Sequence, residues 1–338
     1  MRQVVISRYG PPDVLRTENA PDPTPGAGEA RIRVRAAGVN FADVLARLGL
    51  YPDAPKLPLV VGYEVSGVVD AVGSGVTALS EGDRVLALTR FGGYSDVAVT
   101  PVTRVFQTPD GLSDAEAAAI PVTFLTAAIA LYRMANVAAG ETVLIHNAGG
   151  GVGIAAAQLA RLRRARILGT ASAAKHHALA AFGVEHAIDY RHADVEHEVM
   201  KLTNGRGADV ILDPLGGASF KSSYRMLAPL GRLVMFGMSA VVTGDRRSWW
   251  HAFRAWRALP TFKPFSLIGR NRGVFGLNVL HLWSEERQLG PLMELLLSEF
   301  RAGRLRAVVA KTFPLDQAAE AHRYLQNRSN IGKVILTT

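Results

Sequence analysis

The sequence contains no cysteine. This absence excludes disulfide bonds, iron–sulfur clusters and every zinc site that needs a thiolate ligand. It also removes the usual sequence sign of the redox compartment. The first ten residues lack the apolar segment of a secretory signal, so we expect a cytoplasmic protein.

Long hydrophobic runs are absent as well. The least polar run, residues 117–132, contains Pro121 and is shorter than the ~18 residues that a membrane-spanning helix needs. We expect it to be a buried core segment. With 338 residues, the chain is long enough for two domains.

Acidic residues are fewer than basic ones, 29 against 38, which gives a formal net charge of +9. Such a charge can attract nucleic acids, membrane surfaces or anionic ligands. The basic residues are scattered, however, with only short clusters such as residues 161–166. We therefore expect a solvated basic surface and no stable nucleic-acid partner, and RNA binding stays as an alternative.

The pattern along the chain predicts two domains of different fold class. The first 120 residues are rich in valine, glycine and proline, and their short alternating runs predict a mainly antiparallel β domain. Ser113 and Glu116 have capping-box spacing, which predicts a helix start. From residue 142, strand-like and helix-like segments alternate, which predicts a doubly wound parallel sheet. We expect residues 1–122 and 302–338 in the first domain and residues 123–301 in the second.

A glycine-rich stretch lies at residues 144–160, between an apolar strand and an alanine-rich helix. Ala148, Gly150 and Gly153 approximate the dinucleotide fingerprint, with alanine in place of the first glycine. Glycine would let the backbone of residues 150–153, including Gly151 and Val152, approach a pyrophosphate at the helix N-terminus. The alternative is a strand–helix turn without a ligand.

The absence of acidic residues after the glycines indicates which nucleotide is bound. An NAD site usually has an acidic residue about twenty positions after the glycines, but no Asp or Glu lies between Glu141 and Glu185. Ser172, Lys175 and Tyr190 stand there instead, and they suit a 2′-phosphate. We therefore expect NADP(H); the alternative is that Lys175 is a solvated helix residue.

An insert at residues 241–273 interrupts the alternating pattern. Its helix-like part puts aromatic residues on one face and arginines around them: Trp249, Phe253, Trp256, Arg246, Arg247, Arg254 and Arg257. Such a helix can lie on a membrane surface, form a lid over a substrate, or pack into a core. We favour a lid or core packing over membrane contact.

Several motifs together resemble the medium-chain dehydrogenase/reductase superfamily, and within it the zinc-independent quinone oxidoreductases. They include GVNFADVLARLGLYP, GYEVSGVVDAVGSGV, LIHNAGGGVGIAAAQLA and LAPLGRLVMFG. The insert followed by GVFGLNVLHLW looks most like the branch of the synaptic-vesicle-membrane-protein homologues. The resemblance implies a GroES-like catalytic domain and a Rossmann NADP(H)-binding domain.

The departures from the zinc-dependent relatives concern the metal. Those relatives have a cysteine at the position of Asn40, a histidine at that of Tyr63, and a four-cysteine zinc lobe that is absent here. Without those ligands we do not expect alcohol oxidation through a zinc alkoxide. We expect no metal, and hydride transfer from NADPH to a quinone or an activated carbonyl double bond.

The resemblance also implies roles for individual residues. It places Asn40 beside the nicotinamide ribose and Tyr51 and Tyr63 along the substrate cleft, where a tyrosine or a water would donate a proton. Tyr51 is equally an aromatic lid residue, and Asp43 and Glu64 are alternatively acceptors for backbone N–H groups. The remaining cofactor-binding residues that it implies are Thr126, Phe236, Phe275 and Asn330.

The resemblance further places residues 274–280 as the last strand of the nucleotide-binding sheet. An exposed edge strand is a pairing template, so we expect a homodimer through this edge, the alternative being a monomer whose insert covers it. A second alternative concerns function: an NADPH-binding protein with little turnover, in a structural or vesicle-associated role.

Overall fold

The computed structural model describes residues 1–242, 244, 249–283 and 285–338. The side chains at 249, 251, 252 and 286 also lie outside this description. The described residues form two compact units by their contacts. The first contains residues 1–125, 244 and 280–338, and the second contains residues 126–242 and 249–279.

The first unit is a mainly antiparallel β structure, which confirms the fold class predicted for the N-terminal domain. Among the described residues, a seven-stranded sheet has the order β15-β16-β3-β5-β6-β8, with β7 paired to β3, and a three-stranded sheet has the order β2-β1-β4. The strands are β1 (Arg2–Ile6), β2 (Leu15–Asn19), β3 (Glu29–Val39), β4 (Leu59–Val60), β5 (Glu64–Val72), β6 (Arg84–Leu88), β7 (Val97–Pro101), β8 (Val105–Gln107), β15 (Val309–Pro314) and β16 (Lys333–Thr337). The helices are α1 (Phe41–Arg47), α2 (Asp114–Ala118), α10 (Glu286–Arg301) and α11 (Ala318–Gln326).

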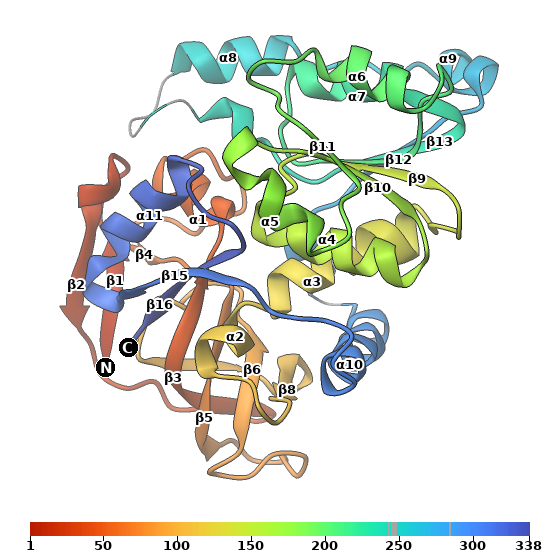
Figure 1. The fold of residues 1–338 in the computed structure, drawn as a ribbon. Coiled ribbons are helices and arrows are strands. Elements are labelled where there is room, and N and C mark those ends of the chain that lie inside the picture. The colour runs from red at the N-terminus through yellow and green to blue at the C-terminus, as the bar shows by residue number, and fades with distance from the viewer. Residues whose placement is uncertain (243, 245–248, 284) are drawn as a thin grey trace. The chain divides into compact units, whose positions relative to one another are not determined.

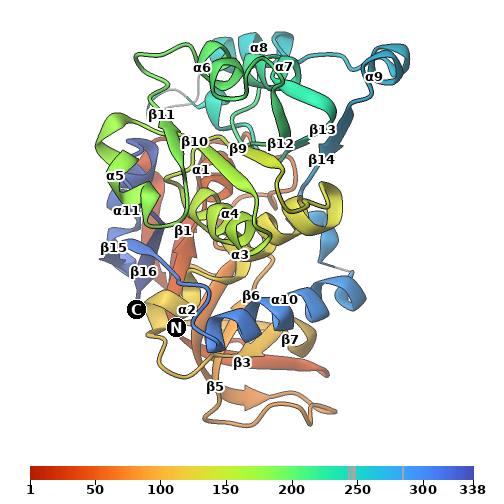
Figure 2. The same cartoon turned by 45° about the vertical axis from the view of Figure 1, so that its right-hand side comes forward.

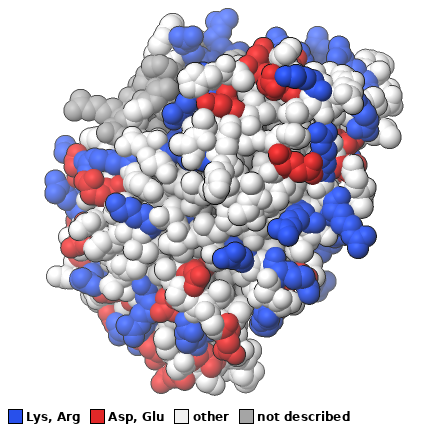
Figure 3. Space-filling view, in the orientation of Figure 1, with Lys and Arg blue, Asp and Glu red and all other residues white. Residues whose placement is uncertain are grey.

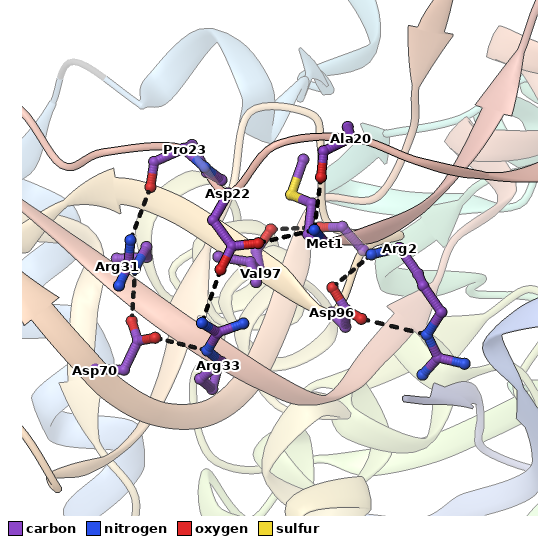
Figure 4. A network of polar contacts seen from close by, with 11 residues as sticks. Met1, Arg2, Ala20, Asp22, Pro23, Arg31, Arg33, Asp70, Asp96 and Val97 are labelled. Atoms are coloured by element: carbon purple, nitrogen blue, oxygen red, sulfur yellow. Dashed lines mark hydrogen bonds and ion pairs between the residues drawn. The ribbon is translucent and has the colours of Figure 1, made fainter.

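Strand β3 shows how the sequence sets the two faces of this sheet. Ile32 and Val34 point into the core, and Arg31 and Arg33 alternate with them on the other face. There Asp70 accepts from both arginines, and Asp22 accepts from Arg33 and from the N-terminal amine (Figure 4). Because these groups are partly exposed to water, their ion pairs contribute little to stability.

The predicted capping box at the start of α2 is confirmed. Glu116 Oε2 accepts from the Ser113 backbone N–H at 2.9 Å, and Ser113 Oγ accepts from the Glu116 N–H at 3.3 Å. Helix α3 (Pro121–Ala128) then carries the chain into the second unit and continues as a π-helix, Ile129–Met134. Most of this least polar run is buried, as predicted.

The second unit is a doubly wound α/β structure, as predicted. Its described sheet has six strands in the order β11-β10-β9-β12-β13-β14, all parallel (Figure 2). Helices α4 and α5 lie on one face and α6 and α7 on the other (Figure 1). The strands are β9 (Thr142–Ile145), β10 (Arg166–Thr170), β11 (His186–Ile188), β12 (Ala208–Asp213), β13 (Leu227–Met235) and β14 (Gly273–Gly276). The helices are α4 (Gly151–Leu162), α5 (His176–Ala180), α6 (Val195–Leu202), α7 (Ala218–Arg225), α8 (Trp249–Arg257) and α9 (Pro264–Arg270).

Strand β14 lies at the edge of the sheet but is shorter than predicted. It ends at Gly276, and residues 279–282 form a 3₁₀ turn instead of continuing the strand. The Leu277 N–H donates to the Met235 carbonyl at 2.8 Å, within the same sheet. Residues 280–301 join the first unit and not the second, because Phe300 packs edge-on against Phe124 at 4.8 Å between ring centroids.

Of the two arrangements favoured for the insert, a lid or core packing, core packing of the aromatic face is wrong for its described side chains. On α8, Trp250, Phe253 and Trp256 are 64%, 46% and 66% exposed. Their rings form a row with centroids 6.4 and 6.2 Å apart. Instead, Ala255 on α8 is half-buried and faces inward. Arg246, Arg247 and the Trp249 side chain lie outside the described residues.

Candidate active site

The glycine-rich loop of the second unit joins β9 to α4. Gly150 precedes the first turn of α4, where Gly151, Val152 and Gly153 leave their backbone N–H groups at the helix start. The loop is tied to the neighbouring strand, because the Ala148 N–H donates to the Thr170 carbonyl at 3.0 Å.

Two glycines of this loop are required by close packing. A Cβ on Gly153 would lie 2.4 Å from the Asn147 carbonyl oxygen, and one on Gly150 would lie 2.7 Å from Asn147 Nδ2. The helix therefore begins directly against the strand, with glycines at its positive end. This loop has the shape and charge that a pyrophosphate needs.

Ser172, Lys175 and Tyr190 lie at the carboxyl ends of β10 and β11. These ends are joined by a hydrogen bond from the Ala171 N–H to the Ile188 carbonyl at 3.1 Å. Lys175 is only 9% exposed, and its Cδ would lie 2.9 Å from a Cβ placed on Gly149. The alternative of a solvated lysine is therefore wrong: its stem covers the glycine loop. Tyr190 is 37% exposed, and Ser172 is half-buried.

Asp189 is an acidic residue at this edge, just beyond the acid-free stretch. Its carboxylate accepts from His192 Nδ1 at 2.8 Å and from the Arg191 N–H at 3.1 Å. The hydrogen bond from His192, with those from backbone N–H groups of Arg191 and Ala173, holds the pKa of Asp189 below its usual range. The carboxylate is thus occupied by groups of its own loop and of the turn after β10.

A buried polar network lies next to the glycine loop, and no pattern in the sequence predicted it. His146 lies between Thr170 Oγ1, at 3.3 Å from Nδ1, and Ser223 Oγ, at 3.1 Å from Nε2. Ser223 donates to Asp213 at 2.7 Å, so His146 donates to Ser223 and accepts from Thr170. Burial lowers the pKa of His146, which keeps the ring neutral.

Three further candidate cofactor residues belong to other segments of the second unit. Thr126 is 6% exposed in α3. Phe236 follows β13 and is half-buried, and its N–H donates to the Asp213 carbonyl at 3.1 Å. Phe275 is half-buried within the edge strand β14.

In the first unit, the half-buried Asn40 forms a triad with the buried Glu64 and Lys333. The Asn40 side chain donates from Nδ2 to Glu64 Oε1 at 2.9 Å, and Lys333 Nζ lies 2.5 Å from both Asn40 Oδ1 and Glu64 Oε1. Glu64 is fully buried, and its other oxygen accepts from the Val122 N–H at 2.8 Å. Both ends of the Asn40 amide are therefore fixed.

Gly38 leaves room for this carboxylate. A Cβ at that position would lie 2.4 Å from Glu64 Oε1 and 2.6 Å from its Cδ. Such distances are far inside van der Waals contact, so any side chain at residue 38 would displace Glu64. Glycine is therefore required at residue 38, because a larger residue would not fit beside the Glu64 carboxylate.

A second buried chain of polar groups begins at Asp43, which accepts from the backbone N–H groups of Asn40 and Gly62 at 2.7 and 3.0 Å. The hypothesis that Asp43 and Glu64 are acceptors for backbone N–H groups is therefore confirmed. Tyr94 also donates to Asp43, at 3.1 Å.

Arg47 sets the direction of the hydrogen bonds in this chain of polar groups, because a guanidinium group can only donate. Arg47 Nη1 lies 3.3 Å from His322 Nδ1, and His322 Nε2 lies 3.1 Å from the Tyr94 hydroxyl. His322 therefore accepts at Nδ1 and donates at Nε2, while Tyr94 donates onward to Asp43. Burial and the Arg47 charge keep the pKa of His322 well below its usual value.

Tyr63 and Tyr51 form an aromatic group with Phe91. The ring centroids of Tyr63 and Phe91 are 5.2 Å apart, and those of Tyr63 and Tyr51 are 6.3 Å apart. Tyr63 is 2% exposed, and its hydroxyl has no hydrogen-bond partner among the described residues. Burial and the nearby Asp43 raise the pKa of Tyr63, so this hydroxyl stays protonated. Asn330 is buried before β16 and donates to the Gly332 carbonyl at 2.8 Å.

We expect the stability of the protein to depend on pH through Asp43. Burial raises the pKa of Asp43 from 3.8 to about 7, so the folded state keeps a proton that the unfolded state loses above pH ~4. Its contribution to the free energy of unfolding is present below pH ~4 and falls by about 1.4 kcal/mol per pH unit towards pH ~7.

The measurement is urea unfolding of the natural protein and of Asp43→Asn between pH 4 and 7. The stability of the natural protein relative to the variant should fall as the pH rises. A constant offset between the two proteins, which the lost acceptor alone would produce, contradicts the assignment. His322 acts in the opposite direction below pH ~6.5, but it does so in both proteins and cancels in the difference.

Comparisons with known proteins agree with this architecture. The alcohol dehydrogenase GroES-like domain family matches residues 26–110, and the family described as zinc-binding dehydrogenase matches residues 182–336. The chain is 38% identical over 339 residues to a synaptic vesicle membrane protein VAT-1 homolog from Danio rerio, covering 100% of this chain and 70% of the relative.

Two solved structures are similar over nearly the whole chain. The CurK enoyl reductase has a TM-score of 0.86 and 33% identity, covering 99% of this chain and 98% of that one. The Escherichia coli quinone oxidoreductase complexed with NADPH has a TM-score of 0.88 and 28% identity, covering 100% of both chains.

No helix in the described part of the chain is both long and apolar enough to cross a membrane. Within the same residues, no three His, Asp or Glu side chains are grouped so as to hold a metal ion. On the two family matches, the close relative and the shared two-unit fold, the chain belongs to the medium-chain dehydrogenase/reductase superfamily, close to the VAT-1 homologues.

Proposed function

We propose that this protein is a zinc-independent oxidoreductase that uses NADPH to reduce a quinone or an activated carbonyl double bond. The observation that carries the proposal is the position of Lys175, nearly buried against the glycine loop at a sheet edge that lacks an acidic ribose clamp. The likeness to a quinone oxidoreductase with NADPH and to an enoyl reductase supports the same chemistry.

The second unit holds most of the proposed nucleotide site. The backbone N–H groups of residues 150–153, after Ala148, bind the pyrophosphate, and Ser172, Lys175 and Tyr190 bind the 2′-phosphate. NADPH, when bound, supplies the hydride. The residues that the family resemblance implies for the rest of the cofactor are proposed contacts as well: Asn40, Thr126, Phe236, Phe275 and Asn330.

The proposed catalytic groups lie in the first unit. The Asn40 amide is held in one orientation by Glu64 and Lys333, so it can present a fixed polar group to bound ligands. Reduction of an enone or quinone leaves negative charge on oxygen. The Tyr63 hydroxyl is protonated and has no partner among the described residues, so it can donate to that oxygen, with Tyr51 beside it.

The test is NADPH oxidation with a panel of quinones, enones, acrylates and acyl thioesters. We expect turnover with at least one class, and a loss of about 10²-fold or more in kcat for Tyr63→Phe with little change in NADPH affinity. NADPH binding without turnover on any of these classes would instead support the alternative, a nucleotide-binding protein in a structural or vesicle-associated role.

Chelation should leave activity unchanged. The chain has no cysteine, and Tyr63 occupies the position of a histidine ligand, so no catalytic zinc should be required. Activity is measured before and after prolonged dialysis against a strong chelator, alongside elemental analysis. Stoichiometric zinc that leaves together with turnover would contradict this expectation.

We also expect a homodimer that pairs through β14. The Leu277 N–H points towards β13, and the N–H groups of successive residues in a strand point to opposite sides. The N–H groups of Val274 and Gly276 therefore point away from the sheet. Val274→Pro removes one of these outward donors, which an edge strand tolerates. Sedimentation equilibrium should give a dimer for the natural protein and a monomer for the variant, with NADPH affinity preserved in both. An undiminished dimer in Val274→Pro would rule out this edge.

A further inference from the structure

The part of the insert that carries α8 and α9, residues 246–273, contains basic residues and no acidic ones. The acid-free stretch extends to residue 284, and the next acidic residue is Glu285. The two helices lie on the same side of the sheet as α7 (Figure 1), and basic side chains follow this edge of the second unit in Figure 3. The insert therefore adds a positively charged layer outside α7.

A cavity of about 670 Å³ lies between α7, α8 and α9. Its apolar lining includes Leu259, Pro260 and Leu267, together with the Tyr224 and Phe262 rings, whose centroids are 5.3 Å apart. This volume is within the range of small-molecule sites. None of the residues of the glycine loop lines it, so it is separate from the proposed nucleotide site.

The charged part of the lining comes from the outer face of α7 and from both helices of the insert. Lys221, Arg257 and Arg270 line the cavity and are exposed, and none of them is ion-paired with a carboxylate of the described residues. By contrast, Arg225, on the same wall, is paired with Glu196. Three cations thus line one cavity without a carboxylate partner among the described residues.

A fourth cation behind the wall shows the same excess of positive charge. Arg272 donates from Nη1 to the Tyr224 carbonyl at 2.8 Å, while its Nε is buried without a hydrogen-bond partner among the described residues. Burial, and the like charge of Arg270, lower the pKa of Arg272. An anion in the cavity would relieve this repulsion.

We propose that the cavity binds an anionic amphiphile, with one acidic head group at Lys221, Arg257 and Arg270 and a hydrocarbon chain against Leu259, Pro260 and Leu267. The cations recognise a phosphate or carboxylate, and the apolar lining excludes ligands that are charged along their whole length. The site goes beyond the proposed reductase function and does not depend on it.

The probe is dodecyl phosphate below its critical micelle concentration, titrated into the full-length protein by calorimetry. We expect one site, weakened about tenfold or more by Lys221→Gln/Arg270→Gln. The matched control Arg16→Gln/Arg287→Gln removes the same charge elsewhere and should bind normally. NADPH affinity should be the same in all three proteins, which shows that the variants are folded.

Further measurements test the hydrocarbon chain, the head group and the source of the ligand. Octyl and butyl phosphate should bind progressively more weakly, by up to about fourfold per CH₂, and dodecyltrimethylammonium should not bind. Equal loss of affinity in the control variant, or displacement of the probe by NADPH, would overturn the proposal. So would binding to phosphatidylglycerol vesicles without binding to the monomeric probe, which would mean a bilayer contact through the exposed aromatic row of α8.

Discussion

Replacing Lys333 with methionine should destabilise the protein by about 3–5 kcal/mol. The substitution keeps the apolar stem but leaves the Glu64 carboxylate, which is fully buried, without the cation 2.5 Å away. A buried charge that loses its partner costs several kcal/mol, because the carboxylate has already given up its hydration. Urea unfolding followed by circular dichroism measures the change.

The double variant Glu64→Gln/Lys333→Met is the control for this prediction. A neutral glutamine still accepts from the Val122 N–H and no longer needs a cation, so the double variant should recover much of the lost stability. A double variant as unstable as the sum of the two single changes would show that the two side chains act independently. Asn40 would also lose one of its two anchors in Lys333→Met, so KM for NADPH should rise together with the loss of stability.

Lys175→Ala should weaken NADPH binding roughly ten- to a hundredfold and leave NADH binding nearly unchanged. A charge-assisted hydrogen bond to a phosphate contributes about 1.5–3 kcal/mol. NADH has no 2′-phosphate, so it does not make this bond and does not lose it in the variant. Equilibrium titration with both cofactors, following nucleotide fluorescence, measures the two affinities. The natural protein should bind NADPH substantially more tightly than NADH.

Lys201→Ala is a matched control, because this lysine is exposed on α6 and far along the chain from the loop. It should leave both affinities unchanged. If Lys175→Ala weakened NADPH and NADH equally, the lysine would contact the part that both cofactors share, and the specificity would have to come from Ser172 or Tyr190. Equal binding of NADPH and NADH by the natural protein would contradict the proposed cofactor itself.

Local patterns in the sequence predicted the features that depend on neighbouring residues. The strand, the glycines and the small-residue helix around Gly150 and Gly153 lie within one short stretch, so their spacing alone specifies the loop. The Ser113 capping box is local in the same sense. Strand length at β14 was overestimated because apolar composition does not mark where a strand stops pairing.

Contacts between distant residues could not be predicted in this way. Lys333 meets Asn40 across 293 positions of the chain, and His322 meets Tyr94 across 228. Each residue alone is an ordinary polar side chain, and only the antiparallel pairing of β16 with β3 brings Lys333 to Asn40. On α8 the periodicity identified an aromatic face but not which face turns inward, because alanines can pack closely against other elements.

The space at Gly38 links two positions in evolution as well as in the fold. A chain that acquires alanine at residue 38 must move or shorten the side chain at residue 64, since a methyl group there would lie 2.4 Å from Glu64 Oε1. Relatives that keep the acidic residue at 64 should therefore keep glycine at 38. Substitutions at the two positions should appear together across an alignment, with the basic residue at 333 changing in the same sequences.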